Sequence, residues 1–225
     1  MGSADVDPGS ADPTGAPEQA RSGDEVASPG RLTVRGVVVA GHQGSATTVR
    51  RALGHPDPDL RRAGLGAAAR SGLLDEARLL DALRDPDPGV RRRAVELAGR
   101  RPASPALQAA LLDALDDEDG VAEMAAFSLG EWAEDAPGVA DALSRVARQH
   151  PDPLCREAAV AALGAMGAGL PTILDALAHD RATVRRRAVL ALAPFDGPEV
   201  DEALHHALED RDWQVRQAAE DLLEP

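Results

Sequence analysis

The chain has 225 residues, of which 44% are apolar and only 2% aromatic, and its net charge is −14. Alanine and leucine supply most of the apolar residues, a mixture that favours closely packed helices over a sheet. All 24 basic residues are arginine. The acidic balance argues against nucleic-acid binding, because affinity for a phosphate backbone depends on a basic surface.

Residues 1–30 differ in composition from the rest of the chain. They are rich in Gly, Pro, Ser and Asp, and they hold six acids against one arginine, Arg21. Such a segment cannot bury enough apolar surface to offset the entropy lost on ordering. We predict a disordered acidic tail over 1–30, interpreted as a solubilising segment with partner binding as the alternative, and a folded domain over 31–225.

Targeting signals are the next feature to consider. The sequence has no run of about 20 apolar residues that would span a bilayer and no N-terminal pattern typical of a signal peptide. A single cysteine, Cys155, cannot form an intrachain disulfide. We therefore expect a cytoplasmic protein that does not bind membranes. The chain has no Lys, Tyr or Asn, three residues with AT-rich codons, which favours a bacterial origin with a GC-rich genome.

From residue 31 onward the sequence repeats the pattern V-R-x-x-A-x-x-A/L-L/A-G. We call the first apolar position of each copy its anchor. The anchors of six copies are Leu60, Val90, Val121, Cys155, Val184 and Val215. Their spacing of 30, 31, 34, 29 and 31 residues is typical of a solenoid of stacked units. A partial earlier copy has Leu32 as its anchor.

Each copy is predicted to form two helices. The first ends in a motif such as LLDALRD at 79–85 or ILDALAHD at 173–180. The second starts at an acid three residues before the anchor, with proline next in three copies, which is a strong helix-start pattern. These N-cap acids are Asp57, Asp87, Glu118, Asp152 and Asp212. Gly99, Gly130 and Gly164 are predicted to mark the far ends of second helices.

Three segments resemble one known family of repeats. They read DPDPGVRRRAVELAG at 85–99, PDPLCREAAVAALG at 151–164 and DRDWQVRQAAEDLL at 210–223. They resemble the HEAT-like repeats of the phycobilisome-lyase type, and the resemblance covers roughly residues 31–225. It implies an all-α fold: a right-handed α-solenoid of about six helical hairpins with a partial N-terminal repeat. It implies no single function, because the family includes both scaffolds and lyase subunits.

One position after the anchor, an arginine falls within the apolar arc of the second helix. The arginines at this position are Arg61, Arg91, Arg156, Arg185 and Arg216, and only the third copy departs, with Ala122. An arginine among apolar residues needs a partner. We therefore predict a structural ladder, in which each arginine bonds a turn carboxylate or carbonyl of its own or a neighbouring repeat. The candidate acids are Asp57, Asp87, Asp152 and Asp212.

Other positions of the second helix point away from the core. In the solenoids that this chain resembles, second helices line the concave face. The predicted partner-binding residues on this face are Arg62, Arg92, Arg93, Glu123, Met124, Phe127, Arg186, Arg187 and Leu190. Apolar groups flanked by arginines suit a protein or peptide partner. The alternative interpretation is a solvated surface with scattered apolar groups.

The candidates for chemistry are few. His150 and His179 fall at equivalent turn positions and would lie about 10 Å apart, too far to share one zinc ion. Cys155 replaces Val or Leu at an anchor, which favours a core residue over a nucleophile. The sequence has no glycine-rich phosphate loop, H-E-x-x-H or G-x-S-x-G. We predict no catalytic residue, metal or cofactor.

These patterns favour a non-catalytic scaffold or adaptor that binds a protein or peptide on its concave surface, and we expect a monomer. One alternative is an enzyme or enzyme subunit similar to the bilin lyase subunits, which would need a pocket with convergent polar groups. A third and less favoured hypothesis is a protein similar to the HEAT-like alkylpurine DNA glycosylases. Those use a basic concave face with aromatic residues, whereas this chain is acidic and nearly free of aromatics.

Overall fold

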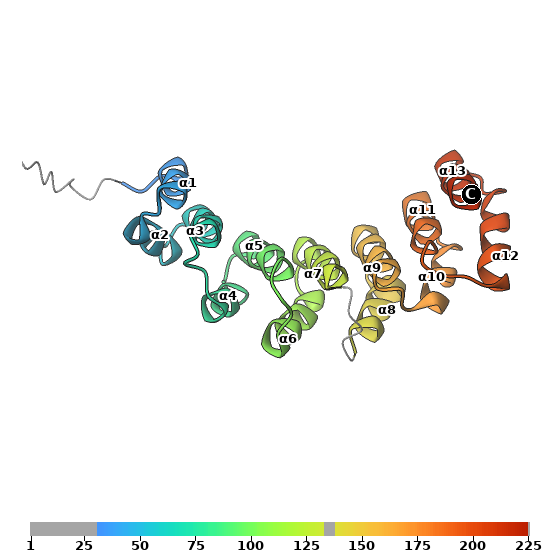
Figure 1. Cartoon of the computed structure of the whole chain (residues 1–225), viewed down its shortest axis with the longest axis horizontal. Coiled ribbons are helices and arrows are strands. Elements are labelled where there is room, and N and C mark those ends of the chain that lie inside the picture. The colour runs from blue at the N-terminus through green and yellow to red at the C-terminus, as the bar shows by residue number, and fades with distance from the viewer. Residues whose placement is uncertain (1–30, 133–137, 225) are drawn as a thin grey trace, which may run out of the picture. The chain divides into compact units, whose positions relative to one another are not determined.

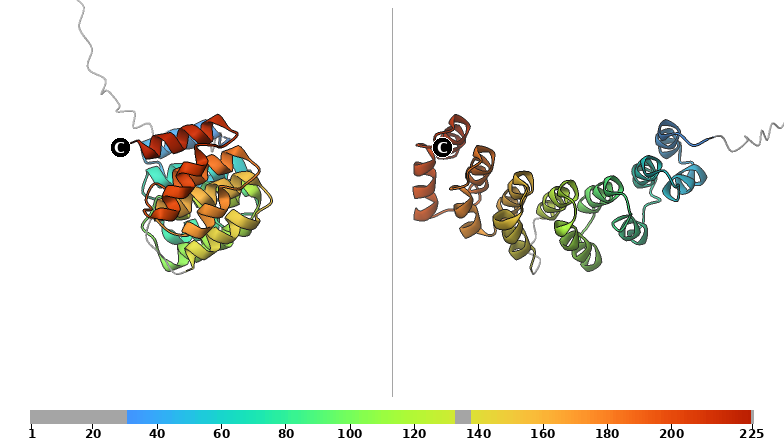
Figure 2. Two further views of the ribbon diagram at one scale, coloured as in Figure 1. Left: turned by 90° about the vertical axis from the view of Figure 1, so that its right-hand side faces the viewer. Right: turned by 180° about the vertical axis from the view of Figure 1, so that it is seen from behind.

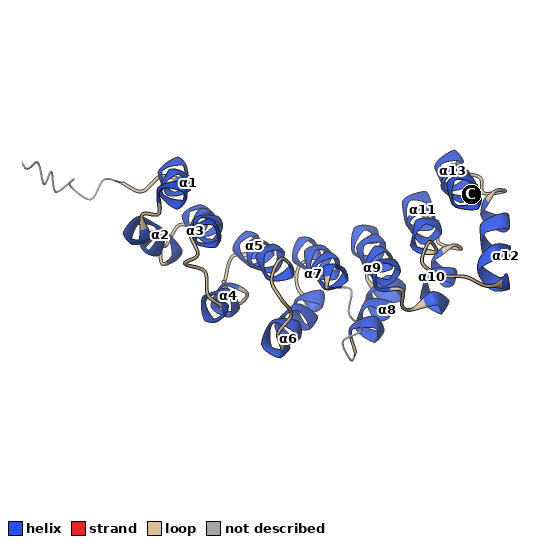
Figure 3. Ribbon diagram, in the orientation of Figure 1, coloured by secondary structure: helices blue, strands red, loops and turns tan. Residues whose placement is uncertain are grey.

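The computed structural model describes residues 31–132 and 138–224, and over these ranges the chain forms thirteen α-helices, one 3-10 helix and no strand (Figures 1 and 3). Residues from Leu32 onward form one compact unit. The predicted acidic tail, 1–30, lies outside the described residues and stays a prediction.

The helices after α1 (Val34–Gln43) pair into six successive hairpins. The hairpins are α2 (Ala46–Leu53) with α3 (Pro58–Arg70), α4 (Glu76–Ala82) with α5 (Pro88–Gly99), α6 (Pro105–Asp113) with α7 (Asp119–Glu131), α8 (Val139–Gln149) with α9 (Pro153–Met166), α10 (Leu170–Ala176) with α11 (Ala182–Ala191), and α12 (Pro198–Ala207) with α13 (Trp213–Leu223). The 3-10 helix η1 (Ala114–Asp116) follows α6. The predicted all-α repeat fold, with a partial first repeat, is confirmed.

The second helices start where the acid-proline pattern predicts. Asp57, Asp87, Asp152 and Asp212 each accept a hydrogen bond from a backbone N–H in the first turn of the helix that follows. Each such cap stabilises its helix by about 1 kcal/mol. Glu118 is the exception, because its side chain makes no capping hydrogen bond.

Second helices pack on one another along the chain, α1 on α3, α3 on α5 and so on to α13 (Figures 1 and 2). Glycine allows this close approach. A Cβ atom on Gly130 or Gly164 would lie 2.8 or 2.7 Å from the α-carbon of Ala162 or Ala191 on the next second helix. As predicted, Gly99, Gly130 and Gly164 lie in the last turns of their helices, but the capping residues are Arg100, Trp132 and Gly167. Gly130 and Gly164 are glycines because the next backbone leaves no room for a side chain.

The core lies between the two helices of each hairpin and between successive hairpins. All six anchors are buried there, and Cys155 is fully buried. Burying a Val or Leu side chain contributes roughly 1.5–3 kcal/mol. Trp132 is half-buried and its indole Nε1 donates to the carbonyl of Arg101. Among the described helices, none has the length and apolarity needed to cross a membrane.

Candidate functional site

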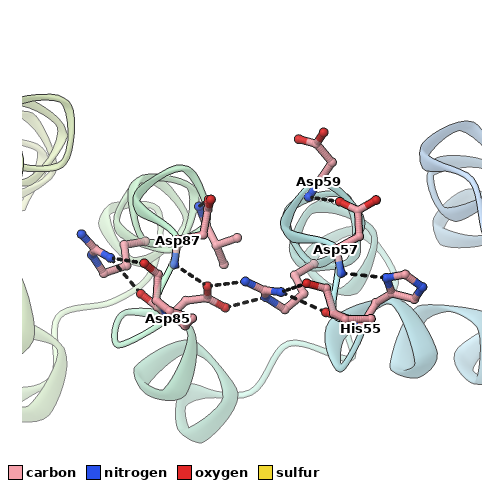
Figure 4. A network of polar contacts seen from close by, with 10 residues as sticks. His55, Asp57, Asp59, Asp85 and Asp87 are labelled. Carbon is pink, nitrogen blue, oxygen red and sulfur yellow. Dashed lines mark hydrogen bonds and ion pairs between the residues drawn. The ribbon is translucent and has the colours of Figure 1, made fainter.

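In four repeats the arginine after the anchor connects its own turn to the turn of the next repeat. Arg61 donates from Nε and Nη2 to the carboxylate of Asp85, at 2.8 and 2.7 Å. Its Nη1 donates to the carbonyls of His55 and Pro56, at 3.0 and 2.8 Å. Figure 4 shows Asp85 at the centre of this network, where it also accepts a hydrogen bond from the backbone N–H of Asp87.

The same arrangement recurs along the stack. Arg91 donates to both carboxylate oxygens of Asp117, at 2.7 and 2.6 Å. Arg185 does the same to Asp210, at 2.8 Å for each bond. Its side chain is only 6% exposed. The predicted ladder is therefore present in the structure.

The other two arginines of the ladder, Arg156 and Arg216, have different partners. Arg156 donates to the carbonyl of His150, and its Nη1 contacts ring nitrogen Nε2 of His179 at 3.0 Å. Arg216 donates to the carbonyl of Asp210 at 2.8 Å. For Arg156 an imidazole therefore takes the place of the carboxylate, whereas Arg216 keeps only the bond to a carbonyl of its own turn.

The choice of carboxylates for the ladder was wrong. Asp57, Asp87, Asp152 and Asp212 cap their own helices, so their oxygens are used by backbone N–H groups. The acids that bind arginine come earlier in each turn. They are Asp85, Asp117 and Asp210.

The ladder lowers the pKa values of its acids. Hydrogen bonds from Arg91 and Arg185 hold the pKa values of Asp117 and Asp210 below the usual value. Burial acts to raise the pKa of Asp85, but hydrogen bonds from Arg61 and the Asp87 backbone outweigh it, so this pKa is also lowered. These acids are therefore charged at neutral pH, and their ion pairs with arginine stabilise the fold.

The ladder is interrupted at α7, where Ala122 takes the arginine position. The thiol of Cys155 on α9 donates to the carbonyl of Asp119 at 3.2 Å across this junction. Burial, followed by the charges of Asp152 and Asp119, raises the pKa of the Cys155 thiol to about 12. A thiol with this pKa is protonated at neutral pH and is not a nucleophile, in keeping with its expected place in the core.

The predicted arginines of the partner-binding face do not form one patch. Arg62, Arg92 and Arg186 are exposed. Arg62 pairs with Asp59 at 2.8 Å, and Arg92 donates to the carbonyl of Gly120 at 3.1 Å. Both therefore have local partners on the surface.

Arg93 and Arg187 are each half-buried and paired with a glutamate. Arg93 pairs with Glu96 at 2.5 Å and lines a separate hollow beside Gly66. Arg187 bonds Glu157 at 3.4 Å. Both were predicted on the face that points away from the core, but Arg93 lies over α3 and pairs with Glu96 of its own helix, whereas Arg187 bonds Glu157 of the neighbouring helix α9.

A groove on the second-helix surface gathers several of the other predicted residues. We call it the α7–α9 groove, and it has a volume of about 320 Å³. It is lined by Glu123, Met124, Phe127, Leu154, Glu157, Ala158, Ala161 and Arg187. Leu190 lies in an adjoining hollow that shares Ala161 and Arg187. The groove therefore holds the predicted apolar residues Met124 and Phe127. The predicted arginines Arg62, Arg92, Arg93 and Arg186 do not line it.

Among the groove residues absent from the predicted set, Leu154 is the large apolar one. It is 56% exposed, as is Phe127 across the groove. A signal was available, because Leu154 is the one large apolar residue at the position before an anchor. The other copies have Asp59, Gly89, Gly120, Thr183 and Gln214 there.

The charges around the groove are mainly acidic. Glu123 and Glu157 line it, and Arg187 is bonded to Glu157. The arginine rim expected from the sequence was therefore wrong, since Arg93 lies over α3 beside Gly66. With a net charge of −14 for the whole chain, the groove favours a cationic partner.

A larger hollow, of about 440 Å³, lies near the start of the stack and is lined by residues of α2, α3 and α4. Its central polar groups, Arg61 and Asp85, are bonded to each other. A ligand there would have to compete with a ladder rung, so we do not regard it as the functional site.

A family profile described as HEAT repeats matches residues 76–164 and 141–224, more than half of the chain. The chain belongs to the HEAT-repeat family. The resemblance to HEAT-like repeats seen in the sequence is thereby confirmed. No curated protein sequence matches the chain.

Solved structures with the same fold include natural and designed proteins. YibA of Escherichia coli is 18% identical, with a TM-score of 0.62, and the match covers 84% of this chain and 73% of YibA. The CpcE–CpcF complex of phycocyanin lyase from Nostoc sp. is 23% identical, with a TM-score of 0.54, covering 92% and 79%. A designed armadillo repeat protein in complex with the peptide (KR)4 is 19% identical, with a TM-score of 0.57, covering 79% and 97%. Identities this low establish the HEAT-type fold alone.

Proposed function

We propose that this HEAT-repeat chain is a non-catalytic scaffold that binds a protein or peptide partner on its concave second-helix surface, with the α7–α9 groove as the main contact. The observation that carries the proposal is the pair Phe127 and Leu154, each 56% exposed and both lining the groove. Large apolar side chains that gather around a surface hollow are typical of binding hot spots, because a partner removes them from water.

The groove also defines the chemistry of the partner. An apolar side chain of the partner would fill the space between Phe127 and Leu154. A neighbouring Arg or Lys would approach Glu123, for which no side-chain partner competes among the described residues. The (KR)4 peptide bound by a designed protein of similar fold is cationic in the same way. Complementary charge of this kind steers association and selects partners.

The shifts in pKa support a non-catalytic role. A general acid or base works best with a pKa near neutral pH. The shifted carboxyls Asp85, Asp117 and Asp210 instead have lowered pKa values and are bonded to arginine. The Cys155 thiol is shifted the other way, to about 12. These shifts are what stable ion pairs and a buried thiol produce.

Peptide selection tests the proposal. A randomised peptide library would be selected on the wild-type chain, and dissociation constants of the selected peptides would be measured for Phe127→Ala and Leu154→Ala. We expect each change to weaken binding at least about tenfold, which is about 1.4 kcal/mol. Trp213→Ala is the matched control, because Trp213 is 63% exposed on α13, away from the groove. Selected peptides that bind all three variants as well as the wild type would rule the groove out.

A further inference from the structure

The junction of α7 and α9 brings together three different metal-binding side chains. A carboxylate oxygen of Asp119, a ring nitrogen of His150 and Sγ of Cys155 all lie within 4.8 Å of one another. Asp119 is the first residue of α7, His150 lies in the turn before α9, and Cys155 is in the first turn of α9. The three residues are thus fixed by two adjacent repeats.

The interruption of the ladder explains why this histidine is available. His150 and His179 are equivalent turn residues, and Nδ1 of each accepts a hydrogen bond from the backbone N–H two residues later. Nε2 of His179 is contacted by Arg156 of the preceding second helix. The equivalent residue before His150 is Ala122, whose side chain cannot reach this turn. Among the described residues, Nε2 of His150 has no hydrogen-bond partner.

We propose that Asp119, His150 and Cys155 form a binding site for a transition-metal cation of the Zn²⁺ class. Sulfur, imidazole nitrogen and carboxylate oxygen together match the preferences of Zn²⁺ and Co²⁺, whereas Mg²⁺ and Ca²⁺ prefer oxygen alone. Three protein ligands of a tetrahedral ion leave a fourth position for water or a partner's side chain.

The three ligand atoms need to move only a short distance toward one another to hold a metal ion. Ligands at the usual zinc distances of 2.0–2.3 Å lie about 3.5 Å apart around a tetrahedral ion. Asp119 is exposed and His150 half-buried, so both side chains have room to turn toward the fully buried Cys155, although the His150 ring must give up the hydrogen bond from the Asp152 backbone N–H to do so.

The thiol proton would leave to solvent as the thiolate–metal bond forms. Because Nδ1 of His150 accepts the backbone N–H of Asp152, the neutral ring carries its proton on Nε2. Metal binding through Nε2 would therefore move this proton to Nδ1 and break that hydrogen bond.

The surroundings favour a cation, and solvent reaches one of the three ligands. The carboxylates of Asp152 and Glu123 act on the thiol together with that of Asp119, so the site is electronegative. His150 also lines a surface hollow of about 300 Å³. Solvent therefore reaches His150 through this hollow, which Asp116, Asp117 and Arg145 also line.

Cobalt titration of the untagged full-length chain, first freed of metal with a chelator, tests this site. We expect one equivalent of Co²⁺ to produce a thiolate-to-cobalt charge-transfer band in the near ultraviolet. This band would belong to Cys155, because the chain has one cysteine. Zn²⁺ should displace the cobalt, abolish the band and raise the melting temperature, because a ligand bound only by the folded state stabilises it. A wild-type chain without the band would overturn the proposal.

Matched variants separate the site from a loss of folding. Cys155→Val introduces the residue found at four other anchors, so the fold should persist while the band disappears. His150→Gln and Asp119→Asn should each weaken Co²⁺ binding at least about tenfold. His179→Gln, at the equivalent turn, should leave the band unchanged. Equal cobalt affinity in His150→Gln and the wild type would contradict the assignment.

Restoring the ladder arginine at position 122 tests the site in the opposite direction. Ala122→Arg should place a guanidinium against His150, as Arg156 lies against His179, and abolish cobalt binding. If this buried substitution unfolds the chain, the comparison of His150→Gln with His179→Gln decides alone.

Discussion

The turn before α5 and the turn before α9 occupy equivalent places in the repeat but differ in what binds them. Asp85 in the first turn is bonded by Arg61 from the preceding repeat. His150 in the second faces a repeat that has Ala122 in place of arginine. Three repeats that have the ladder arginine use turn acids in stabilising ion pairs. At the repeat with Ala122, the side chain of the following turn is left without such a partner. The exposed Phe127 belongs to the same repeat as Ala122.

This contrast has a physical basis. A rung satisfies a partly buried arginine and a partly buried carboxylate at once, so neither is free to bind anything else. α7 still packs on α5 and α9 without an arginine, through buried apolar residues and the glycine contact of Gly130 with Ala162. Loss of one rung is therefore tolerated, and the repeat that lost it is where we place both binding functions.

The largest expected effect comes from breaking one arginine–carboxylate pair of the ladder. Arg91→Ala leaves Asp117, whose side chain is 20% exposed, without its ion-pair partner. We expect a loss of about 3 kcal/mol in the free energy of unfolding, measured in urea. Arg92→Ala should change it by less than about 0.5 kcal/mol, because Arg92 is exposed. Equal losses for the two variants would contradict the ladder's structural role.

The next effect concerns the contact between second helices. Gly164→Ala would place a Cβ atom 2.7 Å from the α-carbon of Ala191. We expect this overpacking to cost about 1–3 kcal/mol in urea unfolding. Gly54→Ala is the control, since a Cβ there would have nothing within 4 Å. A neutral Gly164→Ala would mean that the helices are farther apart than described.

The lowered acid pKa values predict how stability depends on pH. Asp85, Asp117 and Asp210 have folded-state pKa values below those of the unfolded chain. Their contribution is therefore present at neutral pH and is lost as the pH falls through the unfolded and then the folded pKa values. Asp117→Asn should reduce this acid-side loss of stability in urea unfolding. A pH profile of Asp117→Asn identical to that of the wild type would contradict this role of the ion pair.

The smallest effect concerns the charge at the groove. Glu123→Arg should weaken the binding of selected cationic peptides by a few fold, because a partly exposed pair contributes about 0.2–1 kcal/mol. The loss should shrink as salt is added, and calorimetry at two ionic strengths would show it. Glu199→Arg on α12 carries the same charge change outside the groove residues. An identical loss in that variant would indicate a general charge effect.

The sequence predicts the regular parts of this molecule well. The N-cap acids and the ladder arginines recur at the same positions in successive repeats, so comparing the repeats was enough to infer their roles. The partners of those arginines were missed, because the choice between Asp87 and Asp85 depends on which side of the turn faces the preceding repeat. Similarly, the roles of Gly130 and Gly164 depend on how closely the next helix approaches.

The site residues show the same limit. Phe127 and Met124 were predicted from their helical positions, but Leu154 was missed because it lies just before an anchor, outside the positions considered. The Asp119–His150–Cys155 cluster joins residues that are not equivalent in the repeat. Only the packing of two particular repeats brings them together, so the spacing of the repeats in the sequence does not predict that contact.

The central claim is that the regular repeats carry stability and the α7–α9 region carries binding. Measuring both the free energy of unfolding and the peptide dissociation constant for Arg91→Ala and Phe127→Ala tests it most directly. The account predicts that Arg91→Ala loses about 3 kcal/mol of stability and keeps its affinity while folded. Phe127→Ala should keep its stability within about 0.5 kcal/mol and lose at least about tenfold in affinity. Variants that lose both properties together, or exchange these outcomes, would contradict it.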